Sequence, residues 1–267
     1  MLFAMLLTCT GCMWARGNKA AKLPDNYTVR AEQLRVHSDK KLSANHELML
    51  ELKKLRRQVS EEIEIPLQDR EVVVYLFTDE AEYQEYLQSA YPGLPNRRAY
   101  FIGTSSELAV YTFWGDRIQE DMRHEFTHGL LHAAMKDVPL WLDEALAEYF
   151  EVQGPVPGGV NRDSVQSLLT ALENDWSPNL GRLETLTQVH QMQQLDYQES
   201  WAWIHMLMHE STVSKAILLE YLHDLQRGKN PGSFEAHLAS RMPDYRLRLI
   251  AHLAKSLNQP MMTMNSR

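Results

Sequence analysis

An α+β fold is the class that this sequence of 267 residues predicts. Its first half contains β-branched and aromatic runs separated by helical patterns, whereas from Asp163 onward every signal is helical. Strands that come first and helices that come last favour α+β over an alternating α/β fold. With a hydrophobic content of 44 %, the chain is expected to bury one substantial core, in one or two lobes.

The first half is expected to form a scaffold. Its elements, in chain order, are a strand at 27–37, a helix at 45–63, a strand at 71–77, a helix at 79–90, and two strands at 100–103 and 108–114 around a turn. The run EVVVYLF at 71–77 has no polar alternation, which is typical of a central strand covered on both faces. Asp79 and Glu82 are suited to cap the helix that follows.

The second half is expected to be mainly helical. After the turn-rich connector GPVPGG, helical patterns occupy 165–172, 197–209, 213–225, 234–238 and 245–257, and residues 259–267 form a tail.

Residues 124–151, HEFTHGLLHAAMKDVPLWLDEALAEYFE, carry the chemistry. On a helix, His124 and His128 lie one turn apart on a single face, about 6 Å along the axis, and Glu125 lies roughly 100° around from His124. This is the H-E-x-x-H arrangement of metalloproteases.

Pro139 is expected to end this helix and to begin a second one that runs from about Leu140 to Val152. The second helix would present Glu144 as a third metal ligand, with Glu148 one turn further on the same face. Two histidines and one glutamate, with a fourth position open for water, form a known catalytic zinc set.

HEFTH, followed after fifteen residues by the glutamate of WLDEALAEYF, resembles the gluzincin metallopeptidases, in which a W-L-x-E-G-x-A-x-Y-F segment supplies the third ligand. The likeness is closest to uncharacterised bacterial gluzincin-like secreted or lipoprotein-type proteins, and its strong motifs cover about a third of the chain. The gap between the motifs is shorter by roughly a helical turn than in thermolysin or aminopeptidase N. Ala145 also replaces the usual glycine.

The resemblance implies a role for each residue of the motif. His124, His128 and Glu144 would hold one Zn²⁺, Glu125 would act as the general base, and Glu148 would steady the first histidine.

The resemblance also implies a zincin-like peptidase domain at 26–258, with an αβ lobe at 26–153 that carries the metal helices and a helical lobe at 154–258. In zincins an edge strand above the metal pairs with an extended peptide, and Leu108–Phe113 is expected to take that place. The alternative for this segment is an ordinary internal hairpin.

An oxyanion needs a donor besides the metal. Tyr197 is the first choice, because LDYQESWAWIHMLMH resembles the Tyr-x-x-Gly-Ala helix start that supplies a tyrosine in aminopeptidase-type gluzincins, although Ser200 and Trp201 follow here. His205 is the alternative donor, and an ordinary partly buried tyrosine remains a third interpretation.

The remaining histidines fit helix packing better than metal binding. His132 continues the series of His124 and His128, but a drift of about 40° per step carries it off the metal face. His205 and His209 also stand four apart with Glu210 beside them, but no third ligand is evident.

Composition and the N-terminus bear on partners and location. A net charge of −8 argues against a nucleic-acid partner. Both cysteines lie in the first twelve residues, so a disulfide framework is not expected in the mature domain.

The apolar run at 2–8 is too short to span a bilayer, and Gly11-Cys12 resembles a lipoprotein processing site. Residues 1–12 are therefore expected to be a signal peptide, with lipidation at Cys12, and 13–25 a tether to the cell-envelope membrane.

Together these features predict an exported, zinc-dependent metallopeptidase that hydrolyses peptides or proteins in the cell envelope. Endopeptidase action is favoured, because the Gly-x-Met-Glu-Asn box that anchors a free amino terminus in aminopeptidases is absent. The alternative is a catalytically inactive zincin-fold lipoprotein with a binding or assembly role. A third interpretation, in which HEFTH is coincidental, predicts no bound zinc.

Overall fold

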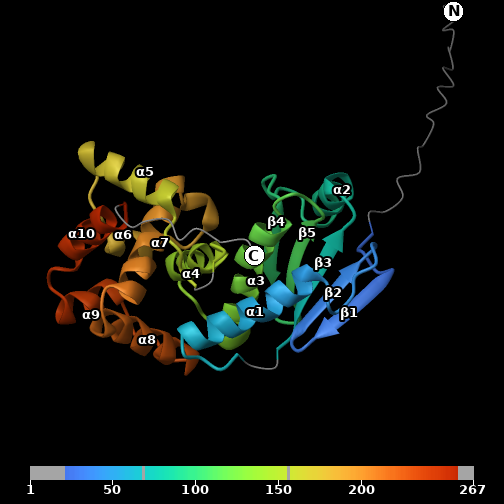
Figure 1. Cartoon of the computed structure of the whole chain (residues 1–267), viewed down its shortest axis with the longest axis horizontal. Helices are drawn as coiled ribbons and strands as arrows, with labels where there is room; N and C mark the ends of the chain where they lie inside the picture. The colour runs from blue at the N-terminus through green and yellow to red at the C-terminus, as the bar shows by residue number, and fades with distance from the viewer. Residues whose placement is uncertain (1–21, 68–69, 155–156, 258–267) are drawn as a thin grey trace, which may run out of the picture.

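The computed structural model describes residues 22–67, 70–154 and 157–257, which form an α+β fold (Figure 1). A five-stranded sheet lies at one end and a group of helices at the other. The strands, in their spatial order, are β1 (Tyr27–Ala31), β2 (Leu34–Ser38), β3 (Val72–Phe77), β5 (Leu108–Phe113) and β4 (Ala99–Gly103). The predicted α+β class is confirmed.

The sheet is mixed. β2, β3 and β5 run parallel to one another, with Val36 opposite Val74 and Val74 opposite Val110, whereas β1 and β4 pair antiparallel at the two edges. The single strand predicted at 27–37 is a hairpin of β1 and β2, because Glu32 adopts a left-handed conformation with φ of 55°. A left-handed residue turns the chain, and the sequence pattern did not indicate it.

The strand expected to align substrate is in the wrong place. Leu108–Phe113 forms β5, which lies between β3 and β4 and is paired on both sides. An extended peptide cannot add to a strand whose two edges are occupied. The edge strand is β4, so the expectation for Leu108–Phe113 is wrong and the alternative, a hairpin of β4 and β5, is correct.

Helices cover both faces of the sheet. α3 (Ile118–Ala134) packs on one face with α1 (Glu47–Glu62) beside it, and α2 (Glu80–Ala90) packs on the other. Side chains of β3 join both layers: Val74 belongs to the larger core cluster with Phe126 of α3, and Phe77 packs with Tyr83 of α2. The prediction of a central strand covered on both faces is therefore confirmed.

Gly129 allows α3 to approach the sheet closely. A Cβ added at this position would lie 2.7 Å from Cγ1 of Val72 in β3, closer than side chains pack. This glycine follows His128 directly, so it fixes the depth at which the metal-motif helix sits against the sheet.

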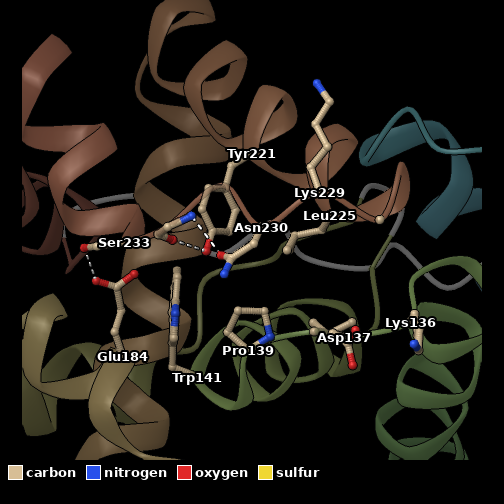
Figure 2. Close-up of a pocket in the computed structure, with 13 residues that line it drawn as sticks. Lys136, Asp137, Pro139, Trp141, Glu184, Tyr221, Leu225, Lys229, Asn230 and Ser233 are labelled. Carbon is tan, nitrogen blue, oxygen red and sulfur yellow. Dashed lines mark hydrogen bonds between the residues drawn. The ribbon is translucent and has the colours of Figure 1, made fainter.

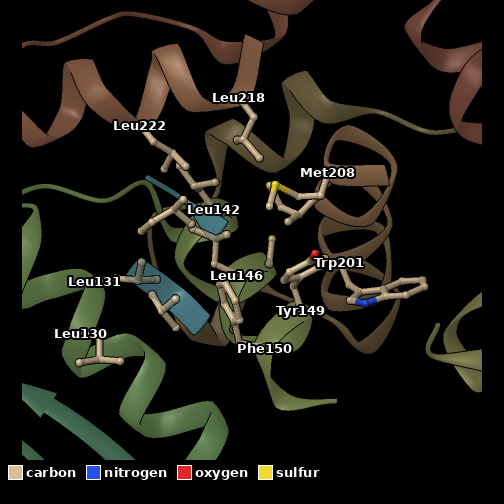
Figure 3. Packing of buried hydrophobic residues seen from close by; sticks show 14 of the residues in the cluster. Leu130, Leu131, Leu142, Leu146, Tyr149, Phe150, Trp201, Met208, Leu218 and Leu222 are labelled. Carbon is tan, nitrogen blue, oxygen red and sulfur yellow. The ribbon is translucent and has the colours of Figure 1, made fainter. Parts of the chain in front are cut away.

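The second half is helical, as predicted. Its helices are α4 (Leu140–Glu151), α5 (Arg162–Glu173), α6 (Leu180–Thr185), α7 (Gln194–His209), α8 (Thr212–Gln226), α9 (Phe234–Arg241) and α10 (Tyr245–Leu257), with a 3₁₀ turn at Val189–Gln191. α6 was not predicted, because six residues are too few for a clear period. Figure 3 shows α4 as the centre of the packing, with Leu142 and Leu146 set among side chains of α3, α7 and α8.

Within the described ranges, the structure has no helix of the length and apolar character needed to cross a membrane. The expected signal peptide, the lipidation site Cys12, most of the tether and the tail at 259–267 lie outside the described residues.

Candidate metal centre

The two motif helices are held in an antiparallel arrangement by a short link. α3 ends at Ala134, five residues before Pro139, so the prediction that Pro139 itself ends the helix is wrong. Met135 already adopts an extended conformation, with φ of −130° and ψ of 136°. α4 then starts at Leu140 as predicted, which turns Glu144 back toward α3.

Three predicted ligand side chains converge between these helices. Glu144 Oε2 lies 3.6 Å from His124 Nε2 and 3.7 Å from His128 Nε2. These separations are too long for hydrogen bonds, but they are close to the roughly 3.3 Å that separates neighbouring ligand atoms around a tetrahedral zinc with bonds of 2.0–2.1 Å. The donor set therefore fits a zinc ion.

The other ring nitrogen of each histidine faces a carboxylate. His124 Nδ1 donates to Glu151 Oε2 at 2.8 Å, and Asp143 Oδ2 lies 3.0 Å from His128 Nδ1. The hydrogen bond to Glu151 fixes the ring of His124, and for both rings the carboxylate on the Nδ1 side leaves Nε2 facing Glu144. Asp143 also accepts a hydrogen bond from His132 Nε2 at 3.0 Å, so His132 bonds this carboxylate instead of joining His124, His128 and Glu144.

Glu151 makes the contact that was expected of Glu148. Both follow Glu144 on α4. Glu151 is seven residues further on, so its side chain points within about 20° of the direction of Glu144, whereas Glu148 is four residues further on and deviates by about 40°. Glu151 therefore reaches His124, whereas Glu148 lies beside it, with ligand atoms of His124, Glu148 and Glu151 all within 4.8 Å of one another. Burial, reinforced by the carboxylate of Glu151, raises the pKa of Glu148 to about 7.

The charge balance favours a cation. Burial alone would lower the pKa of His124, but the carboxylates of Glu144 and Glu151 outweigh it and hold that pKa well above its ordinary value. Burial likewise opposes protonation of His128, whose pKa the neighbouring Asp143 raises to about 9. Positive charge is thus stabilised between the two helices, and a bound metal ion would supply it.

Glu125 lies next to this cluster on α3 and contacts the edge strand. Its Oε2 accepts a hydrogen bond of 2.6 Å from the backbone N–H of Phe101 in β4. The contact orients the carboxylate and brings the unpaired edge of the sheet beside the predicted general base.

Arg123 holds the two helices in register. Its guanidinium is buried and donates from Nε to the carbonyl oxygen of Phe150 at 2.8 Å, at the C-terminal end of α4. Nη1 pairs with Glu51 of α1 at 2.5 Å. A cation at this end complements the helix dipole and satisfies carbonyls that the helix leaves free.

A cleft of about 530 Å³ opens over the ligands, and its lining includes His124, Glu144, Tyr197 and Arg97. The Tyr197 hydroxyl is shielded from solvent and has no well-formed hydrogen bond. Burial and the carboxylate of Glu144 raise the pKa of Tyr197, and the nearby Arg97 guanidinium opposes that shift. His205, the alternative oxyanion donor, does not line the cleft and is hydrogen-bonded to His252 instead.

A second cavity, of about 650 Å³, lies at the start of α4 (Figure 2). Pro139, Trp141 and Tyr221 line it, and none of the three predicted ligands does. It is separate from the cleft over the metal centre, because the two linings have no described residue in common.

The sequence contained signals for some of the residues that were missed. Glu144, Glu148 and Glu151 follow the i, i+4, i+7 spacing of one helix face, which could have indicated Glu151. Asp143 and Arg97 had no such signal, because their positions depend on how neighbouring elements pack.

No protein-family model matches the chain, and no curated protein matches it either.

Proposed function

We propose that this protein is a zinc-dependent metallopeptidase of gluzincin type with a zincin-like fold. The observation that carries the proposal is the convergence of His124, His128 and Glu144 at separations that suit a single tetrahedral ion, with Glu125 beside them. A site with three protein ligands leaves a coordination position open, as catalytic zinc sites do.

A Zn²⁺ held there would polarise a peptide carbonyl and lower the pKa of a water molecule. Glu125 would accept the proton of the attacking water and pass it to the leaving amine. Tyr197, with its buried hydroxyl in the same cleft, would donate a hydrogen bond to the developing oxyanion. β4 would bind the substrate backbone along its free edge, close to Glu125.

The proposal includes location and substrate. The chain would be exported and held at the cell-envelope membrane by a lipid on Cys12, where it would cleave peptides or proteins, with endopeptidase action favoured.

Metal analysis of the full chain, purified without added zinc, is the first experiment. One zinc per chain is expected. A protein that contains no metal and does not bind zinc on titration would contradict the proposal and would show that the HEFTH motif is coincidental.

The second experiment compares Glu125→Gln with the unaltered protein on casein and on a peptide library, with products identified by mass spectrometry. The substitution is expected to retain one zinc and to lower kcat by about 10²–10⁴-fold, because only the proton acceptor is lost. Glu85→Gln, on the exposed surface of α2, is the matched control and should keep full activity. Equal and negligible cleavage by all three proteins would favour the inactive binding lipoprotein.

A further inference from the structure

Arg97 stands out among the residues that line the metal cleft. It is the only lysine or arginine in the lining formed by the described residues, which also includes the carboxylates of Glu144, Glu148 and Asp163. It precedes β4 by two residues, so it lies at the start of the strand that borders the site. Apart from the metal ion that His124, His128 and Glu144 are proposed to hold, Arg97 is the positive group of this lining.

The side chain of Arg97 is held in position by an aromatic ring and not by an ion pair. Its guanidinium lies 5.9 Å from the ring centre of Tyr100, in a cation–π contact. Burial opposes its charge, but the Tyr197 hydroxyl and the Glu144 carboxylate raise its pKa above the ordinary arginine value. The guanidinium is therefore charged at every working pH and remains in the cleft.

The neighbouring Arg98 provides the contrast. Arg98 donates from Nε and Nη2 to Asp121 in the first turn of α3, with distances of 3.1 and 2.5 Å, and so ties this loop to the metal helix. Arg97 forms no ion pair with any carboxylate in the part of the chain that the structure describes. One arginine thus anchors the loop, whereas the other lines the cleft, where its guanidinium lies next to the Tyr197 hydroxyl and is not paired with a carboxylate of the described residues.

We propose that Arg97 binds a carboxylate of the substrate, so that the protein selects peptides with a negative group close to the bond that is cleaved. The inference rests on the proposed peptidase function. A planar guanidinium binds a carboxylate through two parallel hydrogen bonds, and Glu148 and Asp163 disfavour a carboxylate in their own part of the cleft. The substrate would therefore enter in one orientation.

The carboxylate can come from two sources. A free carboxyl terminus at Arg97 would make the protein an exopeptidase, whereas an aspartate or glutamate side chain would leave it an endopeptidase. The chemistry at the guanidinium is the same in both cases, so the experiment has to separate them.

The test measures binding to the zinc-loaded full chain carrying Glu125→Gln, so that the peptide is not consumed. The probes for titration calorimetry are N-acetyl pentaalanine with a free carboxyl terminus, its carboxyl-terminal amide, and the amide of the same peptide with glutamate at the last position. We expect one or both of the acidic peptides to bind about 10- to 100-fold more tightly than the neutral amide.

Adding Arg97→Gln is expected to remove that preference and to leave the affinity for the neutral amide unchanged, while Arg97→Lys keeps part of it. Arg241→Gln, which removes the same charge on exposed α9, is the matched control and should keep the preference. Equal affinities for acidic and neutral peptides, or no binding of any of them, would overturn the inference. If the unaltered chain cleaves neither these peptides nor casein and the peptide library, but still shows the Arg97-dependent preference, the peptidase proposal fails and the carboxylate site stands.

Discussion

Two pairs of histidines in this molecule have the same spacing on a helix but different surroundings. His124 and His128 of α3 face Glu144, and their outer nitrogens face Glu151 and Asp143. His205 and His209 of α7 have ring centres 4.6 Å apart, and a third imidazole, His252 of α10, bonds to His205 with 2.7 Å between Nδ1 and Nε2.

The difference lies in what the neighbouring helices contribute. Around His205, burial and the two other imidazoles lower the pKa to about 3, and burial, with smaller contributions from His209 and Lys255, lowers the pKa of His252 to about 4. Around His124 and His128, carboxylates of α4 reverse the effect of burial. The same four-residue spacing therefore gives two opposite electrostatic environments, and the charges on the neighbouring helix decide which one each pair has.

The largest effect is expected on metal binding. His124→Ala should abolish stoichiometric zinc, and Glu151→Gln should lower the zinc affinity by about 10–100-fold, as for outer partners of metal ligands in general. His209→Ala is the matched substitution in the second pair and should keep one zinc per chain. Chelation should lower the melting temperature of the unaltered protein but not that of His124→Ala. Metal loss in His209→Ala would contradict the comparison.

The residues that precede the two pairs also differ. Arg123 is buried and bonded to Phe150 and Glu51, whereas Ile204 is buried among apolar side chains. Arg123→Met should lower the free energy of unfolding by about 3–5 kcal/mol, because it leaves buried polar partners unpaired. Ile204→Met should cost less than about 1.5 kcal/mol. Urea unfolding followed by fluorescence measures both free energies. Equal losses of stability in the two variants would show that Arg123 does not hold the two helices together.

The sequence indicated the motif helices, the shared face of His124 and His128, and most helix positions, because all of these depend on spacing within one element. It did not indicate which strand lies at the sheet edge, since the order of strands is set by long-range pairing. For the same reason it could not show that Glu151 rather than Glu148 bonds His124, or that His252 joins His205. Those contacts depend on how whole elements pack.

Acid should destabilise the protein through the second cluster. The pKa values of His205 and His252 are lower in the folded protein than the ordinary value near 6.5, so the unfolded chain binds more protons between about pH 6.5 and pH 4. Stability is therefore lost as the pH falls through that window, by about 2 kcal/mol per histidine at pH 5.

His252→Gln should weaken this pH dependence when unfolding is measured by urea titration at pH 7 and pH 5. An unchanged slope would mean that His252 takes up its proton without opening the contact between α7 and α10.

The smallest effect concerns the residue that follows each pair. Gly129 follows His128, and the Cβ of Gly129→Ala would meet Val72, a β-branched and fully buried side chain that has no room to move. Overpacking of this kind lowers the free energy of unfolding by about 1–3 kcal/mol. The better helix propensity of alanine raises it by at most about 1 kcal/mol, so a net loss of about 1 kcal/mol is expected. Glu210 follows His209 at the end of α7 and pairs with Arg248 on a partly exposed surface, so Glu210→Ala should cost less than about 1 kcal/mol. Because α3 would be lifted from β3, Gly129→Ala should also weaken zinc binding, and Glu210→Ala should not. A Gly129→Ala protein that is as stable as the original, with the same zinc affinity, would show that the sheet does not set the position of the metal helix.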